Sequence, residues 1–335
     1  MTFLTPPAGE STSLFERSPR NPILTAADWP YPAHTVFNAG ACQCGDETVL
    51  LVRVEDRRGH SHLTVARSDD GISDWRIDDK PSFVPEPNCF PEEIWGVEDP
   101  RVTWVEDRNE WIIAYTAYSS SGPMVSLAST KDFTSFVRLG PVMPPEDKDA
   151  AVFPRRFGGR YAMIHRPVSP GSVGAHIWLS FSPDLTHWGG HHVLLNARRG
   201  AWWDANKIGL SPPPLKTADG WLLLYHGVRQ TPGGCLYRLG LALLDLEEPW
   251  QVLHRSDEWI FAPELPYEQH GDVSGVVFPC GWILDAATGV IRMYYGGADS
   301  CIGLATAKLA DMLDFIRTCP APAVKRRPGI AVSED

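Results

Sequence analysis

Val65-Ala66-Arg67-Ser68-Asp69-Asp70 ends an apolar stretch with a small residue and a short polar turn, and this tag recurs along the chain. The other copies are Leu127–Asp132, Leu179–Asp184, Leu241–Asp245 and Leu304–Ala307. Their small residues stand at 66, 128, 180, 242 and 305, so successive copies are 62, 52, 62 and 63 residues apart. In four copies an aromatic residue follows eight or nine positions later: Trp75, Phe136, Trp188 and Trp250. The chain therefore consists of five units of about sixty residues.

A strand-rich unit of this length is typical of a four-stranded propeller blade. Alternating apolar stretches such as Thr48–Arg53 recur between turn signals, in a chain with 30 prolines and 29 glycines. We predict an all-β fold, a five-bladed β-propeller at residues 35–318, with an N-terminal arm at 1–34 and a C-terminal tail at 319–335. A β-sandwich is the alternative, but five near-equal spacings favour the propeller.

The charge balance restricts the possible partners. The 335 residues include 30 Lys and Arg against 41 Asp and Glu, a formal net charge of −11. An acidic chain is not expected to bind nucleic acid or an anionic membrane as its main partner, so any basic site must be local. No apolar stretch approaches the roughly 20 residues of a membrane helix, and the first 13 residues lack the cationic start and apolar stretch of a signal peptide.

The seven cysteines are an odd number scattered through the chain, and only Cys42 and Cys44 are close neighbours. No second Cys or His pair completes a zinc site. We therefore expect reduced thiols in a cytoplasmic protein, with no bound metal.

The first strand of each propeller blade lines the central axis, so equivalent polar residues in each blade would share one site. Such a set precedes the tags by 28 to 35 residues: Asn38, Asp99, Lys148, Lys207 and Asp272. The second strands add Arg53, Arg166, His226 and Asp299 near their ends. Each of these residues alone also fits a surface ion pair or a packed strand residue.

Four of these side chains, Lys148, Arg166, Lys207 and His226, would bring like charges to one end of the axis. Like charges at one point repel unless an anion joins them, which predicts a bound phosphate with Asp99 and Asp299 beside it. Asp99 belongs to the run Gly96-Val97-Glu98-Asp99-Pro100-Arg101, in which the proline keeps the aspartate out of a helix.

Tryptophan is frequent, with 13 copies, and a flat ring can bind the apolar face of a sugar. Trp95, Trp202 and Trp203 flank the proposed polar positions, so they are candidate sugar platforms. An acid, an anion site and aromatic platforms together indicate carbohydrate chemistry.

The chain resembles glycoside hydrolase family 130, the β-mannoside phosphorylases, over nearly its whole length. The matching segments are Asn38-Ala39-Gly40, Glu98–Arg101, Lys148-Asp149, Phe153-Pro154, His165–Pro167, Trp203-Asp204, Lys207–Gly209, Tyr225–Val228, Val276–Gly281 and Tyr294–Asp299. The resemblance implies a five-bladed propeller and inverting phosphorolysis of a β-mannoside, which releases α-mannose 1-phosphate. Inorganic phosphate would be a co-substrate, and no cofactor would be needed.

The resemblance also implies roles for individual residues. Asp99 would be the general acid, acting through a hydroxyl of the mannose. The phosphate ligands would be Lys148, Arg166, Lys207 and His226. The sugar would be held by Asn38, Arg53, Asp299, Trp203 and Asp204. Because phosphate is already an anionic nucleophile, the second carboxylate of an inverting glycosidase would not be required.

Two positions depart from the family pattern: Asp204 replaces a usual glutamate and Ser211 a usual glycine, both near Lys207. The nearest alternative is a β-mannosidase that uses water, with Glu98, Asp204 or Asp299 as base. An arabinanase-type hydrolase would not need four cations. A glycan-binding propeller without activity would carry five equivalent pockets, whereas the polar residues here differ between blades. The leaving sugar (glucose, N-acetylglucosamine or mannose), the linkage (β-1,2, β-1,3 or β-1,4) and a possible homo-oligomeric state stay open.

Overall fold

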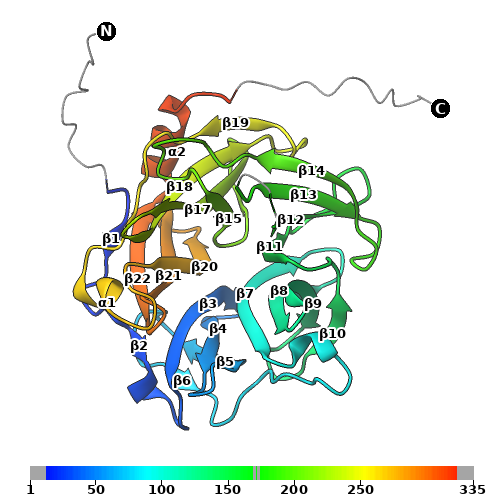
Figure 1. Cartoon of the computed structure of the whole chain (residues 1–335), viewed down its shortest axis with the longest axis vertical. Helices are drawn as coiled ribbons and strands as arrows, with labels where there is room; N and C mark the ends of the chain where they lie inside the picture. Colours follow the sequence, from blue (N-terminus) through cyan, green and yellow to red (C-terminus); the bar gives the residue numbers. More distant parts are fainter. Residues whose placement is uncertain (1–12, 169–170, 172–173, 323–335) are drawn as a thin grey trace.

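The computed structural model describes residues 13–168, 171 and 174–322. Within them the chain forms five antiparallel blades arranged around a central axis (Figure 1). The predicted five-bladed β-propeller is confirmed. Residues 1–12 of the predicted arm and 323–335 of the predicted tail lie outside the described residues.

In each blade the first strand lies nearest the axis, and a parallel pairing of Ser61 with Gly96 joins blades 1 and 2 into one eight-stranded sheet. Blade 1 contains β3 (Thr35–Cys44), β4 (Glu47–Glu55), β5 (Ser61–Ser68) and β6 (Arg76–Ile77). Blade 2 contains β7 (Gly96–Val105), β8 (Glu110–Ser119), β9 (Gly122–Thr130) and β10 (Val137–Pro141). Blade 3 contains β11 (Asp147–Val152), β12 (Tyr161–Pro167), β13 (Ile177–Ser182) and β14 (Gly189–Leu195).

Blade 4 contains β15 (Lys207–Leu210), β17 (Trp221–Thr231), β18 (Gly234–Leu244) and β19 (Val252–Arg255), with β16 (Leu215–Lys216) beside β17. Blade 5 contains β20 (Val277–Asp285), β21 (Val290–Gly297) and β22 (Cys301–Lys308). Its outer edge is completed by β1 (Glu16–Arg17) and β2 (Leu24–Thr25), which both pair with β22.

The recurring sequence tag lies at the end of the third strand of each blade. In blade 1, Asp70 Oδ1 accepts hydrogen bonds from the backbone N–H groups of Ile72 and Ser73, at 2.7 and 2.8 Å. The equivalent aspartates of blades 2, 3 and 4 make the same pair of bonds: Asp132, Asp184 and Asp245. A side chain that satisfies the turn N–H groups lets a short polar segment reverse the chain before the fourth strand.

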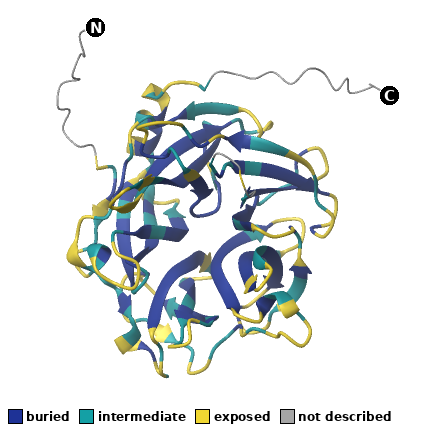
Figure 2. Ribbon diagram, viewed as in Figure 1, coloured by how far each residue is buried: buried dark blue, intermediate teal, exposed yellow. Residues whose placement is uncertain are grey.

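The hydrophobic core is divided into five buried clusters, one between each pair of adjacent blades, including blades 5 and 1. The aromatic residue after the tag packs toward the preceding blade. Trp250 of blade 4 lies 6.1 Å from the ring of Phe181 in blade 3, and Trp75 of blade 1 lies 6.2 Å from Tyr294 in blade 5. Burial therefore follows the strands around the whole ring, while the turns are exposed (Figure 2).

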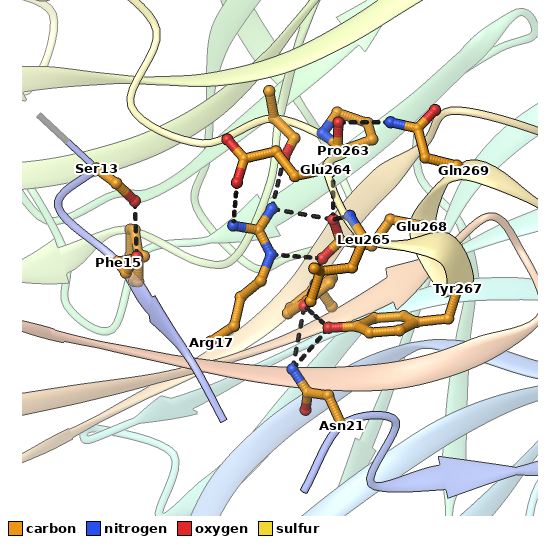
Figure 3. Close-up of polar contacts among 12 residues, drawn as sticks. Ser13, Phe15, Arg17, Asn21, Pro263, Glu264, Leu265, Tyr267, Glu268 and Gln269 are labelled. Carbon is orange, nitrogen blue, oxygen red and sulfur yellow. Dashed lines mark hydrogen bonds and ion pairs between the residues drawn. The ribbon is translucent and has the colours of Figure 1, made fainter. Parts of the chain in front are cut away.

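The N-terminal segment is fixed to blade 5 by a charged network as well as by strand pairing (Figure 3). Arg17 donates from Nε to Glu268 at 2.8 Å and from a terminal nitrogen to Glu264 at 3.0 Å. Glu268 is buried in the short helix α1 (Pro266–Gln269) and also accepts from the hydroxyl of Tyr295 at 2.8 Å. The segment 256–276, which leads into the first strand of blade 5, is thereby held in place.

The other helical elements are η1 (Ala26–Asp28), η2 (Pro91–Glu93) and α2 (Leu309–Thr318). No helix of the described chain has the length and apolar character needed to cross a membrane. After α2, the carbonyl of Pro320 accepts the backbone N–H of Arg255, so the first residues past 318 lie against β19.

Candidate active site

The first strands of blades 1, 2 and 3 each contain a β-bulge near their starting end. The residues in the bulges are Asn38, Asp99 and Asp149, with φ of 48°, 49° and 55°. Asn and Asp tolerate this left-handed conformation, and a bulge turns the side chain away from its regular direction. The three side chains thus occupy equivalent places, so blade 3 contributes Asp149 there rather than the predicted Lys148.

The carboxylate of Asp99 is buried and held on one oxygen by blade 1. Its Oδ1 accepts from Asn38 Nδ2 at 2.9 Å and from Arg53 at 3.0 Å. Arg53 also donates to Glu98 and to Glu55, each at 3.0 Å. The structure therefore brings the predicted Asn38, Arg53 and Asp99 together and adds Glu98 to them.

The pKa values of the carboxyl groups at this cluster are shifted in different directions. Burial alone would raise the pKa of Asp99, but the charges of Arg53, Arg101 and Lys148 hold it below its usual value. Burial raises the pKa of Glu98 against the charge of Arg53. Burial and the nearby charge of Asp99 raise the pKa of Asp299 to about 7. Neighbouring carboxyl groups with separated pKa values are typical of catalytic sites.

The raised pKa of Asp299 has a consequence for stability. In the unfolded chain the carboxyl group has its ordinary pKa of 3.8, so the folded state binds this proton more tightly and loses stability as pH rises toward about 7. We expect Asp299→Asn, which removes the charge, to raise the melting temperature more at pH 8 than at pH 5. Thermal unfolding of both proteins at the two pH values measures the difference, and equal shifts would contradict the prediction.

A second buried carboxylate, Asp149, lies among three of the basic side chains. Arg166 Nε donates to its Oδ2 at 2.7 Å, and His226 Nε2 and Arg101 lie 3.4 Å from its oxygens. These neighbours hold the pKa of Asp149 well below its usual value although burial opposes them. Burial lowers the pKa of His226, against the attraction of Asp149. The expectation of four mutually repelling cations is therefore wrong in part, because Asp149 compensates Arg166 and the imidazole of His226 favours its neutral form.

Gly209 explains how Asp149 and His226 approach each other across the first strand of blade 4. A Cβ atom at this glycine would collide with Asp149 Oδ2 and with the ring of His226. Only glycine leaves this space free, which accounts for Gly209 within the Lys207–Gly209 segment.

Lys148 is the second residue of β11 and Lys207 the first of β15, and neither forms an ion pair within the described part of the chain. Lys148 is close enough to lower the pKa of Asp99 by its charge. Tyr237, which sequence reasoning missed, faces the same centre, and burial with the nearby Asp149 and Asp299 raises its pKa to about 12. Two amines and a phenol hydroxyl are thus available to an anion beside the carboxylates.

Two residues that were predicted to hold the sugar, Asp204 and Trp203, lie inside blade 4 instead. Asp204 is fully buried in blade 4, where its Oδ2 accepts from Arg198 and Arg255, at 3.0 and 2.8 Å. Trp203 is 6% exposed and stacks on Tyr225. Both side chains are already engaged in the blade, which does not support the prediction that they hold the sugar at the bond cleaved.

Asp272 was expected on a first strand, which is wrong: it precedes β20, is half exposed, and pairs with His34 at 2.9 Å. Of the remaining platform candidates, Trp95 and Trp202 are 39% and 42% exposed. Trp95 packs edge-on against Tyr118, and Trp202 lies under Arg198.

Behind the cations runs a chain of hydrogen bonds in blade 3. His165 bonds through Nδ1 to Asp147 Oδ2 at 2.6 Å and through Nε2 to Ser180 Oγ at 2.7 Å. Ser180 Oγ in turn lies 2.7 Å from His191 Nδ1. The other oxygen of Asp147 accepts the backbone N–H of Arg166 at 3.1 Å, so the chain fixes the strand that carries Arg166.

Removal of this support should weaken both the fold and anion binding. We expect His165→Leu to lower the free energy of unfolding by about 1–3 kcal/mol, because a buried carboxylate loses its partner, and to raise KM for phosphate. His165→Asn, which can still donate to Asp147, should restore part of both properties. Urea unfolding and phosphate kinetics measure the two effects, and identical behaviour of the Leu and Asn variants would exclude this role.

The comparisons with known proteins agree with this geometry. A family model described as beta-1,4-mannooligosaccharide phosphorylase matches residues 16–318. The chain is 34% identical to a β-1,4-mannooligosaccharide phosphorylase of Ruminococcus albus over 89% of each chain. It is 35% identical to a 1,2-β-oligomannan phosphorylase of a Thermoanaerobacter species, over 87% of this chain and 95% of that one.

Among solved structures, the β-1,2-mannobiose phosphorylase of Listeria innocua in complex with β-1,2-mannobiose superimposes with a TM-score of 0.82. The match has 28% identity and covers 90% of this chain and 99% of the other. The family model and these relatives show that the chain is a carbohydrate-active enzyme of the glycoside phosphorylase class. The chain belongs to glycoside hydrolase family 130, as its sequence segments indicated.

Proposed function

We propose that the protein catalyses phosphorolysis of a β-mannoside with inversion, releasing α-mannose 1-phosphate. The observation that carries this proposal is the placement of basic side chains at the buried carboxylates of the first strands. The charge of Lys148 lowers the pKa of Asp99, Arg166 bonds to Asp149, and the exposed Lys207 begins the first strand of the next blade. A hydrolase would need no such cations, since water carries no charge to be balanced. Phosphate would bind Lys148, Arg166 and Lys207, with hydrogen bonds from His226 and Tyr237.

In the proposed reaction a phosphate oxygen forms a bond to the anomeric carbon while the bond from that carbon to the leaving oxygen breaks. The leaving oxygen takes a proton that originates on Asp99 and passes through a mannose hydroxyl. Asn38, Arg53 and Asp299 would orient the mannosyl ring. No second carboxylate has to activate the nucleophile, because phosphate is already anionic.

Asp99 must hold a proton to serve as acid, although nearby cations lower its pKa. Arrival of phosphate beside Lys148 would offset part of that positive charge and raise the pKa of Asp99. Phosphate binding and protonation of the acid are therefore expected to be coupled. Asp99 would thus gain the proton that it donates only when the nucleophile is in place.

The test is the reverse reaction. The protein is incubated with α-mannose 1-phosphate and a panel of acceptors: glucose, N-acetylglucosamine, mannose and manno-oligosaccharides. Release of phosphate with one acceptor would support the proposal, and the linkage of the product (β-1,2, β-1,3 or β-1,4) would define the specificity. Free mannose formed from a β-mannoside without phosphate would instead favour the β-mannosidase alternative.

We also infer that the reaction needs no metal, since the basic side chains supply the positive charge. Phosphorolysis in the presence of EDTA tests this directly. The seven cysteines are all free thiols, which supports a reducing, cytoplasmic setting for the enzyme.

A further inference from the structure

Blade 4 borders a cavity of about 590 Å³ that the proposed reaction does not use. The cavity lies between the segment 196–206, which leads into β15, and the segment 256–265, which follows β19. The side chains that define it are Trp202, Trp203, Trp259, Arg199, Arg238 and Glu264.

The cavity opens on the same face of the propeller as the candidate active site. The segment 196–206 leads into the starting end of a first strand, where Asn38, Asp99 and Lys148 also lie. Trp202 precedes Lys207 by only five residues, and Arg238 directly follows Tyr237. The cavity therefore borders the strands β15 and β18, which carry Lys207 and Tyr237.

Aromatic surface is the main feature of the cavity. Trp202 is 42% exposed, with the guanidinium carbon of Arg198 4.4 Å from its ring centre. Trp259 is partly buried and lies under Arg238 at 4.8 Å, while Trp203 and Phe261 are buried. The exposed indole ring of Trp202, backed by a cation, offers a flat platform for the C–H face of a sugar ring.

The charges around the cavity nearly balance. Arg199 and Arg238 stand against the carboxylates of Asp257, Glu258 and Glu264. Asp257 is paired with Arg198 at 2.7 Å and Glu264 with Arg17 at 3.0 Å. Mixed donors and acceptors without a strong excess of either charge fit a neutral polyhydroxyl ligand better than an anion.

The walls are held rigidly before any ligand binds. The indole N–H of Trp203 donates to the carbonyl of Asp257 at 2.8 Å, joining the two segments. On the other wall, Arg17 holds Glu264 and the carbonyl of Ala262 (Figure 3). A preformed site loses little conformational entropy on binding.

We propose that this cavity is an accessory subsite for sugar units of a manno-oligosaccharide that lie beyond the bond cleaved. The proposal rests on the proposed function. Its occupant is the distal part of a longer substrate, so its effect should grow with chain length and be small for a disaccharide.

The test compares Trp202→Ala with Trp250→Ala, a matched control that removes an equally exposed tryptophan of blade 4 outside the cavity. For each protein, kcat/KM for phosphorolysis is measured with the manno-disaccharide and manno-hexasaccharide of the linkage that the enzyme accepts. In Trp202→Ala, the loss of one aromatic contact of about 1 kcal/mol should lower the ratio of the two kcat/KM values, hexasaccharide over disaccharide, about fivefold. The ratio should stay at the wild-type value in Trp250→Ala.

A binding measurement supports the kinetic one. In the Asp99→Asn background, isothermal titration calorimetry with the hexasaccharide should give a larger Kd when Trp202 is also replaced by alanine. An unchanged ratio and an unchanged Kd in the Trp202→Ala proteins would overturn the accessory subsite. If the wild-type enzyme produces no mannose 1-phosphate from any β-mannoside, the proposed function fails instead, so the two failures are distinguishable.

Discussion

Replacement of Asp99 by asparagine is expected to lower the rate of phosphorolysis about 10³-fold, which is within the usual contribution of a general acid. Asparagine has nearly the same shape and can still contact Asn38 and Arg53, so the site should keep its geometry. It carries no proton acidic enough for the leaving oxygen. Steady-state kinetics with a natural β-mannoside measures the loss, and circular dichroism checks the fold.

An activated leaving group separates proton donation from a general loss of binding. The dinitrophenolate group of a dinitrophenyl β-mannoside leaves as a stable anion and needs no proton. The loss of rate in Asp99→Asn should therefore be at least tenfold smaller with that substrate. Asp79→Asn, a change at an exposed aspartate of blade 1, serves as control and should keep wild-type rates with both substrates. An equal deficit on natural and activated substrates would remove Asp99 from the role of acid.

Replacement of Lys207 by glutamine is expected to raise KM for phosphate about ten- to hundredfold, because a hydrogen bond to a charged group contributes about 1.5–3 kcal/mol. Lys207 is exposed and has no ion pair in the described structure, so stability should change little. Lys216→Gln, an exposed lysine on β16 of the same blade, is the matched control and should leave KM for phosphate unchanged. An unchanged KM in Lys207→Gln would count against this lysine as a phosphate ligand.

Arg166→Ala should also raise KM for phosphate, but this change is harder to interpret because the variant is expected to lose stability too. Arg166 is buried and bonded to Asp149, and breaking a buried ion pair costs about 3–5 kcal/mol. The variant is therefore expected to show both a lower melting temperature and a higher KM. Comparison with Lys207→Gln separates the loss of anion binding from the loss of stability.

Much of the site could be predicted because the sequence repeat indicates on which strand a residue lies as well as where the strands form. Once the five tags define five blades, residues about thirty positions before each tag must lie on the first strands. That argument located Asn38, Asp99, Lys148 and Lys207 correctly on first strands and failed for Asp272, where the segment before β20 is longer.

The roles of individual side chains could not be predicted from spacing alone. The β-bulges of β7 and β11 lie at the same place in their blades, so Asp149 is equivalent to Asp99 and Lys148 to Glu98, which spacing to the tag did not show. Arg101 lowers the pKa of the nearby Asp99, but spacing gave no sign that its side chain also reaches Asp149 and the carbonyls of Leu210 and Ser211. Trp203 and Asp204 belong to a matching segment but pack inside blade 4, because a short segment carries both site and core residues.

The sequence by itself determined the architecture and the chemical type of the site, since periodic apolar strands and repeated turn residues depend on local chain chemistry. Tertiary structure alone decided which cations are already compensated, which carboxyl group has a pKa near 7, and where an aromatic cavity forms between two distant segments. These properties depend on burial and on distances between blades, and such distances exist only after the ring has closed.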